Sequence, residues 1–164
     1  MERIFLIGFM GSGKSTIGHA LEKCHSADFA DTDHYIEKKH QRKITDIFAE
    51  EGENYFRELE TEALRTVEAK IVSTGGGIIE RIENISVMKA RGKIVYLAAS
   101  FEEISRRLEG DASRPLWKQD ESGRKALFER REPLYEDAAD YIVQTEGKTA
   151  EEIAECILDY MGSV

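Results

Sequence analysis

Residues 8–15 read Gly8-Phe9-Met10-Gly11-Ser12-Gly13-Lys14-Ser15 and directly follow the apolar run at residues 4–7. This is the G-x-x-x-x-G-K-[ST] pattern of a phosphate-binding loop, in which glycines let successive backbone N–H groups turn toward phosphate oxygens. Lys14 is expected to reach the terminal phosphates and the Ser15 hydroxyl to ligate Mg²⁺. A helix that begins at Lys14 would point its positive end at the same anion. The stretch predicts nucleotide binding, and its alternative is a chance glycine-rich turn.

The composition is typical of one globular domain, and we expect residues 1–164 to form it. The chain is 41% hydrophobic and 34% charged, and none of its apolar stretches approaches the roughly 18 residues of a membrane span. Residues 1–3 lead straight into the first apolar run, which leaves no room for a signal peptide. The formal charge of −9 argues against a nucleic-acid partner, because phosphate backbones select basic surfaces. We therefore expect a cytoplasmic protein without a membrane or nucleic-acid partner.

Five short apolar runs alternate with helix-like stretches, at residues 4–7, 28–30, 71–73, 94–98 and 141–143. Strands that alternate with helices indicate a parallel sheet. The fold class predicted is α/β, a three-layer α/β/α fold of the P-loop nucleoside-triphosphate hydrolase type, with a five-stranded parallel sheet and helices on both faces. Two capping-box spacings, Ser100 with Glu103 and Thr149 with Glu152, mark the starts of two of these helices.

Half of the twelve arginines lie between residues 106 and 131 of an otherwise acidic chain. They are candidate anion clamps, although a solvated helix face is an open alternative. Within this stretch, residues 117–124 are polar and lack hydrophobic periodicity, which predicts a mobile loop. A polar loop flanked by arginines suits a lid of about residues 110–125, since closure keeps water away from phosphoryl transfer.

Two carboxylates, Asp31 and Asp33, follow the second apolar run. The carboxyl ends of parallel strands open onto the ligand crevice, so both should face the phosphates. Asp31 could hold the Mg²⁺ shell, whereas Asp33 could orient an acceptor hydroxyl or take its proton. The alternative is an acidic helix cap at Asp33 and a solvated Asp31. The third run ends at Thr74 without the aspartate that many phosphate-loop proteins use for Mg²⁺, which favours Asp31.

Two further features leave alternatives open. The triplet Gly75-Gly76-Gly77 allows a ligand close to the backbone, but it could also be a flexible turn. Arg57 and Glu60 stand at i,i+3 in a helical stretch, so Glu60 could hold the guanidinium in a fixed pose. A fixed guanidinium suits bidentate recognition of a carboxylate, whereas a surface salt bridge is the plainer interpretation.

In this order, these segments strongly resemble the shikimate kinase family over nearly the whole chain. The resemblance rests on the phosphate loop, Asp31-Thr32-Asp33, Phe56-Arg57 with Glu60, the glycine triplet, Arg114-Pro115-Leu116, and Arg131 ahead of Pro133-Leu134-Tyr135. It implies transfer of the ATP γ-phosphoryl group to the 3-hydroxyl of shikimate, giving shikimate 3-phosphate on the route to chorismate and aromatic amino acids. It also implies a substrate-binding helical segment at about residues 33–62, and we expect a monomer.

The family's site residues are carried over by matching motif positions. The resemblance implies catalytic roles for Lys14, Asp33 and Arg114. Shikimate would contact Asp33, Arg57, Gly75, Gly76, Gly77 and Arg131. ATP would contact Gly11, Ser12, Gly13, Lys14, Ser15, Thr16, Arg107, Arg114 and Lys148. Mg²⁺ would be held by Ser15 and by Asp31 through water.

Other nucleotide users share parts of this pattern. A gluconate kinase would keep the phosphate loop and lid, but it should not need the arginine pair Arg57 and Arg131. A nucleoside monophosphate kinase would need a second base pocket, which we do not find in the sequence. A GTPase-like switch should carry an Asn-Lys-x-Asp segment, which the sequence lacks. Residues 120–123 fit the switch pattern D-x-x-G, but they follow no predicted strand.

Overall fold

The structure is a computed structural model that describes residues 1–109 and 121–162. Five strands form one parallel sheet in the order β2-β3-β1-β4-β5. They are β1 (Arg3–Ile7), β2 (Phe29–Asp31), β3 (Ile71–Ser73), β4 (Gly92–Ala98) and β5 (Tyr141–Gln144). The five predicted strands are therefore confirmed. The second begins one residue later than predicted, at Phe29, although the Asp28 carbonyl still accepts a hydrogen bond from Ile71 N (3.0 Å).

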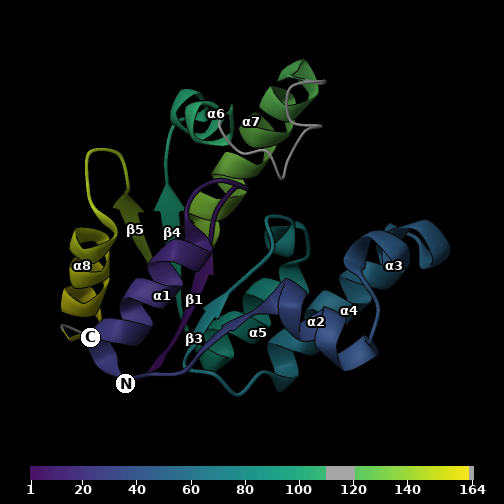
Figure 1. The fold of residues 1–164 in the computed structure, drawn as a ribbon, viewed down its shortest axis with the longest axis horizontal. Coiled ribbons are helices and arrows are strands. Elements are labelled where there is room, and N and C mark those ends of the chain that lie inside the picture. Colours follow the sequence, from purple (N-terminus) through teal and green to yellow (C-terminus); the bar gives the residue numbers. More distant parts are fainter. Residues whose placement is uncertain (110–120, 163–164) are drawn as a thin grey trace.

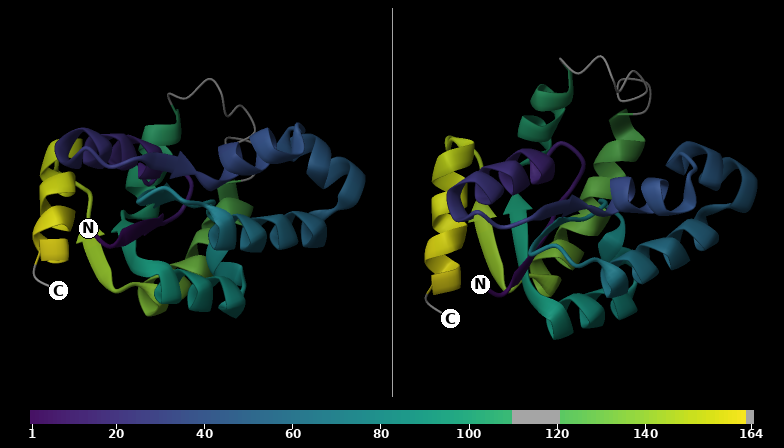
Figure 2. Two further views of the ribbon diagram at one scale, coloured as in Figure 1. Left: turned by 90° about the horizontal axis from the view of Figure 1, so that it is seen from below. Right: turned by 60° about the horizontal axis from the view of Figure 1, so that its bottom comes forward.

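Helices cover both faces of the sheet, as Figure 2 shows. One face packs against α1 (Lys14–His25) and α8 (Ala150–Gly162) through an apolar cluster that includes Leu6, Leu21 and Ile157. The other face packs against α4 (Glu53–Thr66), α5 (Ile82–Arg91), α6 (Phe101–Glu109) and α7 (Glu121–Ala138), with Phe5, Met88, Phe128 and Tyr135 in its cluster. The predicted three-layer α/β/α fold is confirmed.

Three helices extend from the β2 side of the sheet, away from α8 (Figure 1). They are α2 (Thr32–His40), α3 (Ile44–Glu51) and α4, and they share a separate apolar cluster of Ile36, Ile47, Phe56, Leu59 and Ala63. This cluster gives the segment its own core, so that α4 is held at a defined place beside the sheet. The segment corresponds to the substrate-binding region predicted at about residues 33–62.

The helix ends partly follow the sequence signals. At α8 the capping box is complete, because Glu152 N donates to Thr149 Oγ1 (3.1 Å) and Thr149 N donates to Glu152 Oε2 (3.3 Å). At α6 only half of it forms. Glu103 N donates to Ser100 Oγ, but Ser100 N donates to Glu146 instead. The expected reciprocal bond is absent because the Glu103 carboxylate binds Arg106 and Arg107.

The prediction of a loop through residue 124 is wrong at its end, because α7 begins at Glu121. The first turn of α7 is largely exposed, so it has no apolar stripe from which periodicity could be recognised. Arg114 and the rest of the predicted lid up to residue 120 lie outside the described residues. Within the described part of the chain, we find no helix long and apolar enough to cross a membrane.

Candidate active site

The phosphate loop joins β1 to α1 at the carboxyl edge of the sheet. Gly11 and Gly13 have φ of 81° and 96°, values that side chains other than glycine rarely adopt. Gly13 is the N-cap, so α1 begins at Lys14 as predicted. Lys14 Nζ donates to the carbonyls of Gly8 (2.6 Å) and Phe9 (3.1 Å). Phosphate oxygens carry charge and would be stronger acceptors than these carbonyls for the same ammonium group.

A cavity of about 530 Å³ opens beside the loop. It unites the ends of β1, β2 and β3 with the start of α1, as the parallel topology predicts. Ten of the sequence-predicted site residues line it: Gly11, Gly13, Lys14, Ser15, Thr16, Asp31, Asp33, Gly75, Gly76 and Arg107. Met10, Ser73, Thr74 and Leu108 complete the lining. The structure thus brings the phosphate loop, both aspartates and the start of the glycine triplet into one space.

Asp31, and not Asp33, caps α2. Its Oδ1 accepts a hydrogen bond from His34 N (3.1 Å), while Ser15 Oγ donates to its Oδ2 (3.4 Å). The alternative of a cap at Asp33 with a solvated Asp31 is therefore wrong. The carboxylate of Asp31 and the hydroxyl of Ser15 present two oxygen ligands of the kind that Mg²⁺ prefers.

Asp33 lies in the first turn of α2 and faces the cavity. Burial raises the pKa of its carboxyl to about 6, and the negative charges of Asp31 and Glu60 act in the same direction against Lys14. Its buried Oδ1 has no hydrogen-bond partner among the described residues. A buried acceptor without a donor is costly, so this oxygen is suited to receive a hydrogen bond from a ligand hydroxyl.

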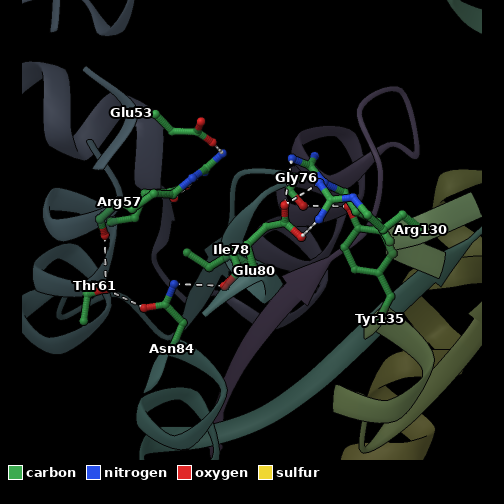
Figure 3. A network of polar contacts seen from close by, with 11 residues as sticks. Glu53, Arg57, Thr61, Gly76, Ile78, Glu80, Asn84, Arg130 and Tyr135 are labelled. Carbon is green, nitrogen blue, oxygen red and sulfur yellow. Dashed lines mark hydrogen bonds and ion pairs between the residues drawn. The ribbon is translucent and has the colours of Figure 1, made fainter. Parts of the chain in front are cut away.

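Arg57 and Glu60 form a buried ion pair on α4. Arg57 Nη1 donates to Glu60 Oε1 (2.6 Å), and the Glu60 side chain is 1% exposed. Glu53 holds the other end of the guanidinium through Nη2 (3.2 Å), as Figure 3 shows. The prediction that Glu60 fixes Arg57 is confirmed, and the alternative of a surface salt bridge is wrong. Burial raises the pKa of Glu60, and the neighbouring Arg57 opposes that effect.

The glycine triplet is the place where the site residues meet. A Cβ atom on Gly75 would lie 2.9 Å from Glu60 Oε2 and 3.3 Å from Asp33 Oδ1. One on Gly76 would lie 3.3 Å from Arg131 Nη1, and one on Gly77 only 2.6 Å from Arg57 Cζ. Each glycine therefore leaves room for a charged side chain, and Ile78 behind them is fully buried. A merely flexible turn does not account for this packing.

Arg131 packs against Gly76, the neighbour of the glycine that Arg57 covers. It lies on α7, is 8% exposed, and its Nη2 is 3.9 Å from Glu80 Oε2. One turn later, Tyr135 donates its hydroxyl to Gly76 O (2.6 Å). The sequence analysis gave Tyr135 no role, although its i,i+4 spacing from Arg131 places both on one helix face.

Arg107 and Lys148 meet at a second cavity of about 280 Å³, beside Ser12 and Thr16. Arg107 donates to Thr145 Oγ1 (3.2 Å) and to the carbonyls of Gly11 and Ser12 (3.4 Å each). Thr145 is buried, and the sequence analysis missed it. Its position directly after β5, at the carboxyl edge of the sheet, is the signal that could have identified it.

The sequence model of the shikimate kinase family matches residues 10–162. A shikimate kinase from Bacillus cereus is 47% identical over 156 residues, which cover 93% of this chain and 94% of that protein. The chain belongs to the shikimate kinase family. The structure of the Acinetobacter baumannii shikimate kinase in complex with shikimate superposes with a TM-score of 0.89 at 36% identity, covering 99% of this chain and 94% of that one.

A more distant likeness concerns the fold alone. The structure of a gluconokinase from Sinorhizobium meliloti superposes with a TM-score of 0.54 at 15% identity, over 99% of this chain and 92% of the other. Members of the shikimate kinase family thus match this chain far better in both sequence and structure.

Proposed function

We propose that this chain transfers the γ-phosphoryl group of ATP to the 3-hydroxyl of shikimate. One observation carries the proposal beyond family membership. Two guanidinium groups, the buried one of Arg131 and that of Arg57, whose side chain is 13% exposed, pack against the glycine triplet, whose first two residues line the cavity. A small acceptor with a carboxylate fits between them, and its hydroxyls then face Asp33 and the phosphates.

In this arrangement Arg57 and Arg131 bind the shikimate carboxylate, and Gly75, Gly76 and Gly77 admit the ring close to the backbone. Asp33 accepts a hydrogen bond from the 3-hydroxyl. The hydroxyl oxygen attacks the γ-phosphorus, the bond from that phosphorus to the β,γ-bridging oxygen breaks, and ADP leaves. Asp33 orients the hydroxyl or receives its proton, and a pKa of about 6 leaves the carboxylate available at neutral pH.

The nucleotide occupies the phosphate loop. The loop residues Gly11, Ser12 and Gly13 and the start of α1 would hold the phosphates, with Ser15 and Thr16 in the first turn. The N–H of Ser12 donates to the carbonyl of Phe9 (3.1 Å) within the loop. Lys14, together with Arg114 outside the described residues, neutralises charge on the moving phosphoryl group. Arg107 and Lys148, which line the second cavity, flank the adenine or a neighbouring phosphate.

Mg²⁺ is the expected cofactor, and the residues present fit it. Ser15 Oγ and Asp31 Oδ2 lie 3.4 Å apart and face the cavity of the phosphate loop. A bound Mg²⁺ would supply charge neutralisation on the phosphate oxygens. Ser15 and Asp31, the latter through water, are the residues that would hold it.

We further propose that the chain acts as a cytoplasmic monomer, with residues 1–164 as one domain and residues 110–125 as its lid. One cavity gathers residues of the phosphate loop, α1, α2 and the end of β3, which supports a single domain. The product, shikimate 3-phosphate, belongs to the synthesis of chorismate and the aromatic amino acids.

A coupled assay of ADP release tests the proposed function. With Mg²⁺ and ATP, we expect turnover on shikimate and none on gluconate or nucleoside monophosphates. Gluconate also carries a carboxylate, but it is an open chain that cannot present the ring and its hydroxyls in the same fixed geometry. Turnover on gluconate together with silence on shikimate would overturn the proposal and favour the gluconate kinase alternative.

A further inference from the structure

A buried polar network without charged members lies behind the glycine triplet. Asn84, in the first turn of α5, is fully buried, and Thr61 on α4 is 2% exposed. Both side chains point toward each other in Figure 3. Buried polar side chains of this kind are costly unless they are hydrogen-bonded, so their partners show what they hold together.

The two side chains connect three elements. Thr61 Oγ1 donates to Asn84 Oδ1 (2.6 Å) and also lies 3.1 Å from the carbonyl of Arg57. Asn84 Nδ2 donates to the carbonyl of Ile78 (2.9 Å), the residue that follows the glycine triplet. The Ile78 carbonyl can only accept, so it fixes the orientation of the Asn84 amide and leaves Oδ1 for Thr61. The network therefore ties α4 to the turn through α5.

This network lies directly beside the close contact between Arg57 and Gly77. Thr61 is one helical turn after Arg57, and Ile78 is the residue after Gly77. The Arg57 guanidinium packs so closely over Gly77 that a Cβ there would lie 2.6 Å from Cζ. The Thr61–Asn84–Ile78 hydrogen bonds and the packing of Arg57 on Gly77 join the same two segments. The distance between α4 and the turn therefore also determines the position of the Arg57 guanidinium.

We propose that Asn84 and Thr61 are positioning residues for shikimate, which set the distance between Arg57 and the glycine triplet. This inference rests on the proposed function. Both side chains are almost wholly buried and bond to each other and to the carbonyls of Arg57 and Ile78, so both act through the segments that they join. An apolar pair of the same size would fill the space but would leave the Ile78 carbonyl unpaired and α4 free to shift. A displacement of a fraction of an ångström at Arg57 is sufficient to weaken a bidentate contact.

Thr61→Val tests the proposal, because it keeps the volume of the side chain and removes only the hydroxyl. We expect the KM for shikimate to rise about tenfold, while the KM for ATP stays within about twofold of the parent value. Thr61→Ser restores the hydroxyl and should return the KM for shikimate to near the parent value. Asn84→Leu, which removes both hydrogen bonds of the amide, should match or exceed the effect of Thr61→Val.

Thr66→Val is the matched control. Thr66 lies on the same helix, and its Oγ1 makes the same kind of bond to the carbonyl four residues earlier, that of Glu62 (2.9 Å). Its other partner is Tyr35 Oη (2.8 Å), and neither bond connects it to the glycine turn. Because Thr66 is exposed whereas Thr61 is buried, this variant should change the melting temperature little and leave the KM for shikimate unchanged.

The outcomes separate the two proposals. If Thr61→Val lowers the melting temperature and leaves the KM for shikimate unchanged, the network has only a structural role and the inference is wrong. Equal increases in the KM for shikimate and for ATP would also contradict it. If Asn84→Leu fails to fold, the KM values for shikimate of Thr61→Val and Thr61→Ser still test the proposal. Silence of the parent protein on shikimate would instead refute the proposed function.

Discussion

At the scale of single residues, Asp33 shows how a site residue can oppose folding. Its carboxyl is buried beside Asp31 and Glu60, and its pKa lies above the ordinary 3.8, at about 6. The folded state therefore holds this proton more tightly than the unfolded chain does. The contribution of Asp33 to stability is fully present below pH 3.8 and is lost as the pH rises through about 6. Ionisation of Asp33, which the proposed role at a substrate hydroxyl requires, therefore lowers the free energy of unfolding.

Asp33→Asn should therefore stabilise the protein at neutral pH. Asparagine cannot ionise, so the variant gains about 3 kcal/mol of unfolding free energy above pH 6 and little at pH 4, relative to the parent. Denaturant unfolding of both proteins from pH 4 to pH 8, without nucleotide or Mg²⁺, measures this difference. Groups distant from Asp33 titrate alike in both proteins and cancel, whereas Asp31 and Glu60, whose charges act on Asp33, contribute to the measured difference. A gain that does not change with pH would contradict the assignment, and we expect kcat to fall about a hundredfold or more in the same variant.

Gly77 provides a second test at this scale. Its φ of −88° is open to any residue, so Gly77→Ala introduces no backbone strain and acts only through the new methyl group. That group would collide with the Arg57 guanidinium. We expect the KM for shikimate to rise at least about tenfold, with the KM for ATP nearly unchanged.

The control for this substitution is Gly162→Ala. A Cβ at Gly162 would meet no described atom within 4 Å, and the residue lies at the end of α8. Both KM values should stay at the parent level there. Equal kinetics of the two alanine variants would show that Arg57 does not need its close approach to Gly77.

At the scale of elements, α6 presents one arginine to the site and its neighbour to solvent. Arg107 contacts Gly11, Ser12 and Thr145, whereas the side chain of Arg106 is 71% exposed and bonds to Glu103. Successive residues on a helix point about 100° apart, which separates the two guanidinium groups. The helix therefore determines which arginine lines the two cavities beside the phosphate loop.

Arg107→Lys should raise the KM for ATP about tenfold and leave the KM for shikimate unchanged. Lysine keeps the charge but cannot make the several hydrogen bonds of the planar guanidinium. Steady-state kinetics with each substrate varied in turn provides the measurement, and Arg106→Lys is its control. If both variants behave like the parent, Arg107 does not contact the nucleotide.

At the scale of the whole molecule, the core connects the two halves of the site. Phe128 of α7 packs edge-on against Phe9 of the phosphate loop, with ring centroids 5.3 Å apart, and also contacts Phe101. The same helix carries Arg131. The core cluster on this face thus holds the loop and one arginine in a common packing arrangement, whereas the cluster under α1 and α8 lies on the opposite face.

Phe128→Leu should lower the melting temperature and raise the KM for both substrates. The smaller side chain leaves space beside Phe9 and lets α7 move relative to the loop. Ile157→Val, on the other face of the sheet, removes one buried methylene at a cost of about 1 kcal/mol. We expect it to lower stability with unchanged kinetics. A thermal melt and initial rates for each variant provide the measurements. Unchanged KM values in Phe128→Leu would show that the packing of Phe128 does not connect the phosphate loop to α7.

The sequence by itself determined the elements that depend on local patterns. The strand positions, the starts of α1, α6 and α8, the phosphate loop and the Asp31, Asp33, Arg57 and Gly75–Gly77 candidates follow from apolar runs, capping spacings and residue types with few alternative uses. It did not show that α7 begins at Glu121, because an exposed turn has no periodicity. It offered a cap at Asp33 as an alternative and did not identify Asp31 as the cap of α2, because aspartate suits a cap at either position.

Only the tertiary structure decided which candidates act together. The partners of Gly76, Thr61 and Arg107 come from residues 59, 23 and 38 positions away, respectively. The burial that shifts Asp33 and makes the pair of Arg57 and Glu60 internal likewise arises from packing between elements. Hydrogen bonds and burial of this kind depend on distance in space, and spacing along the chain contains little information about them.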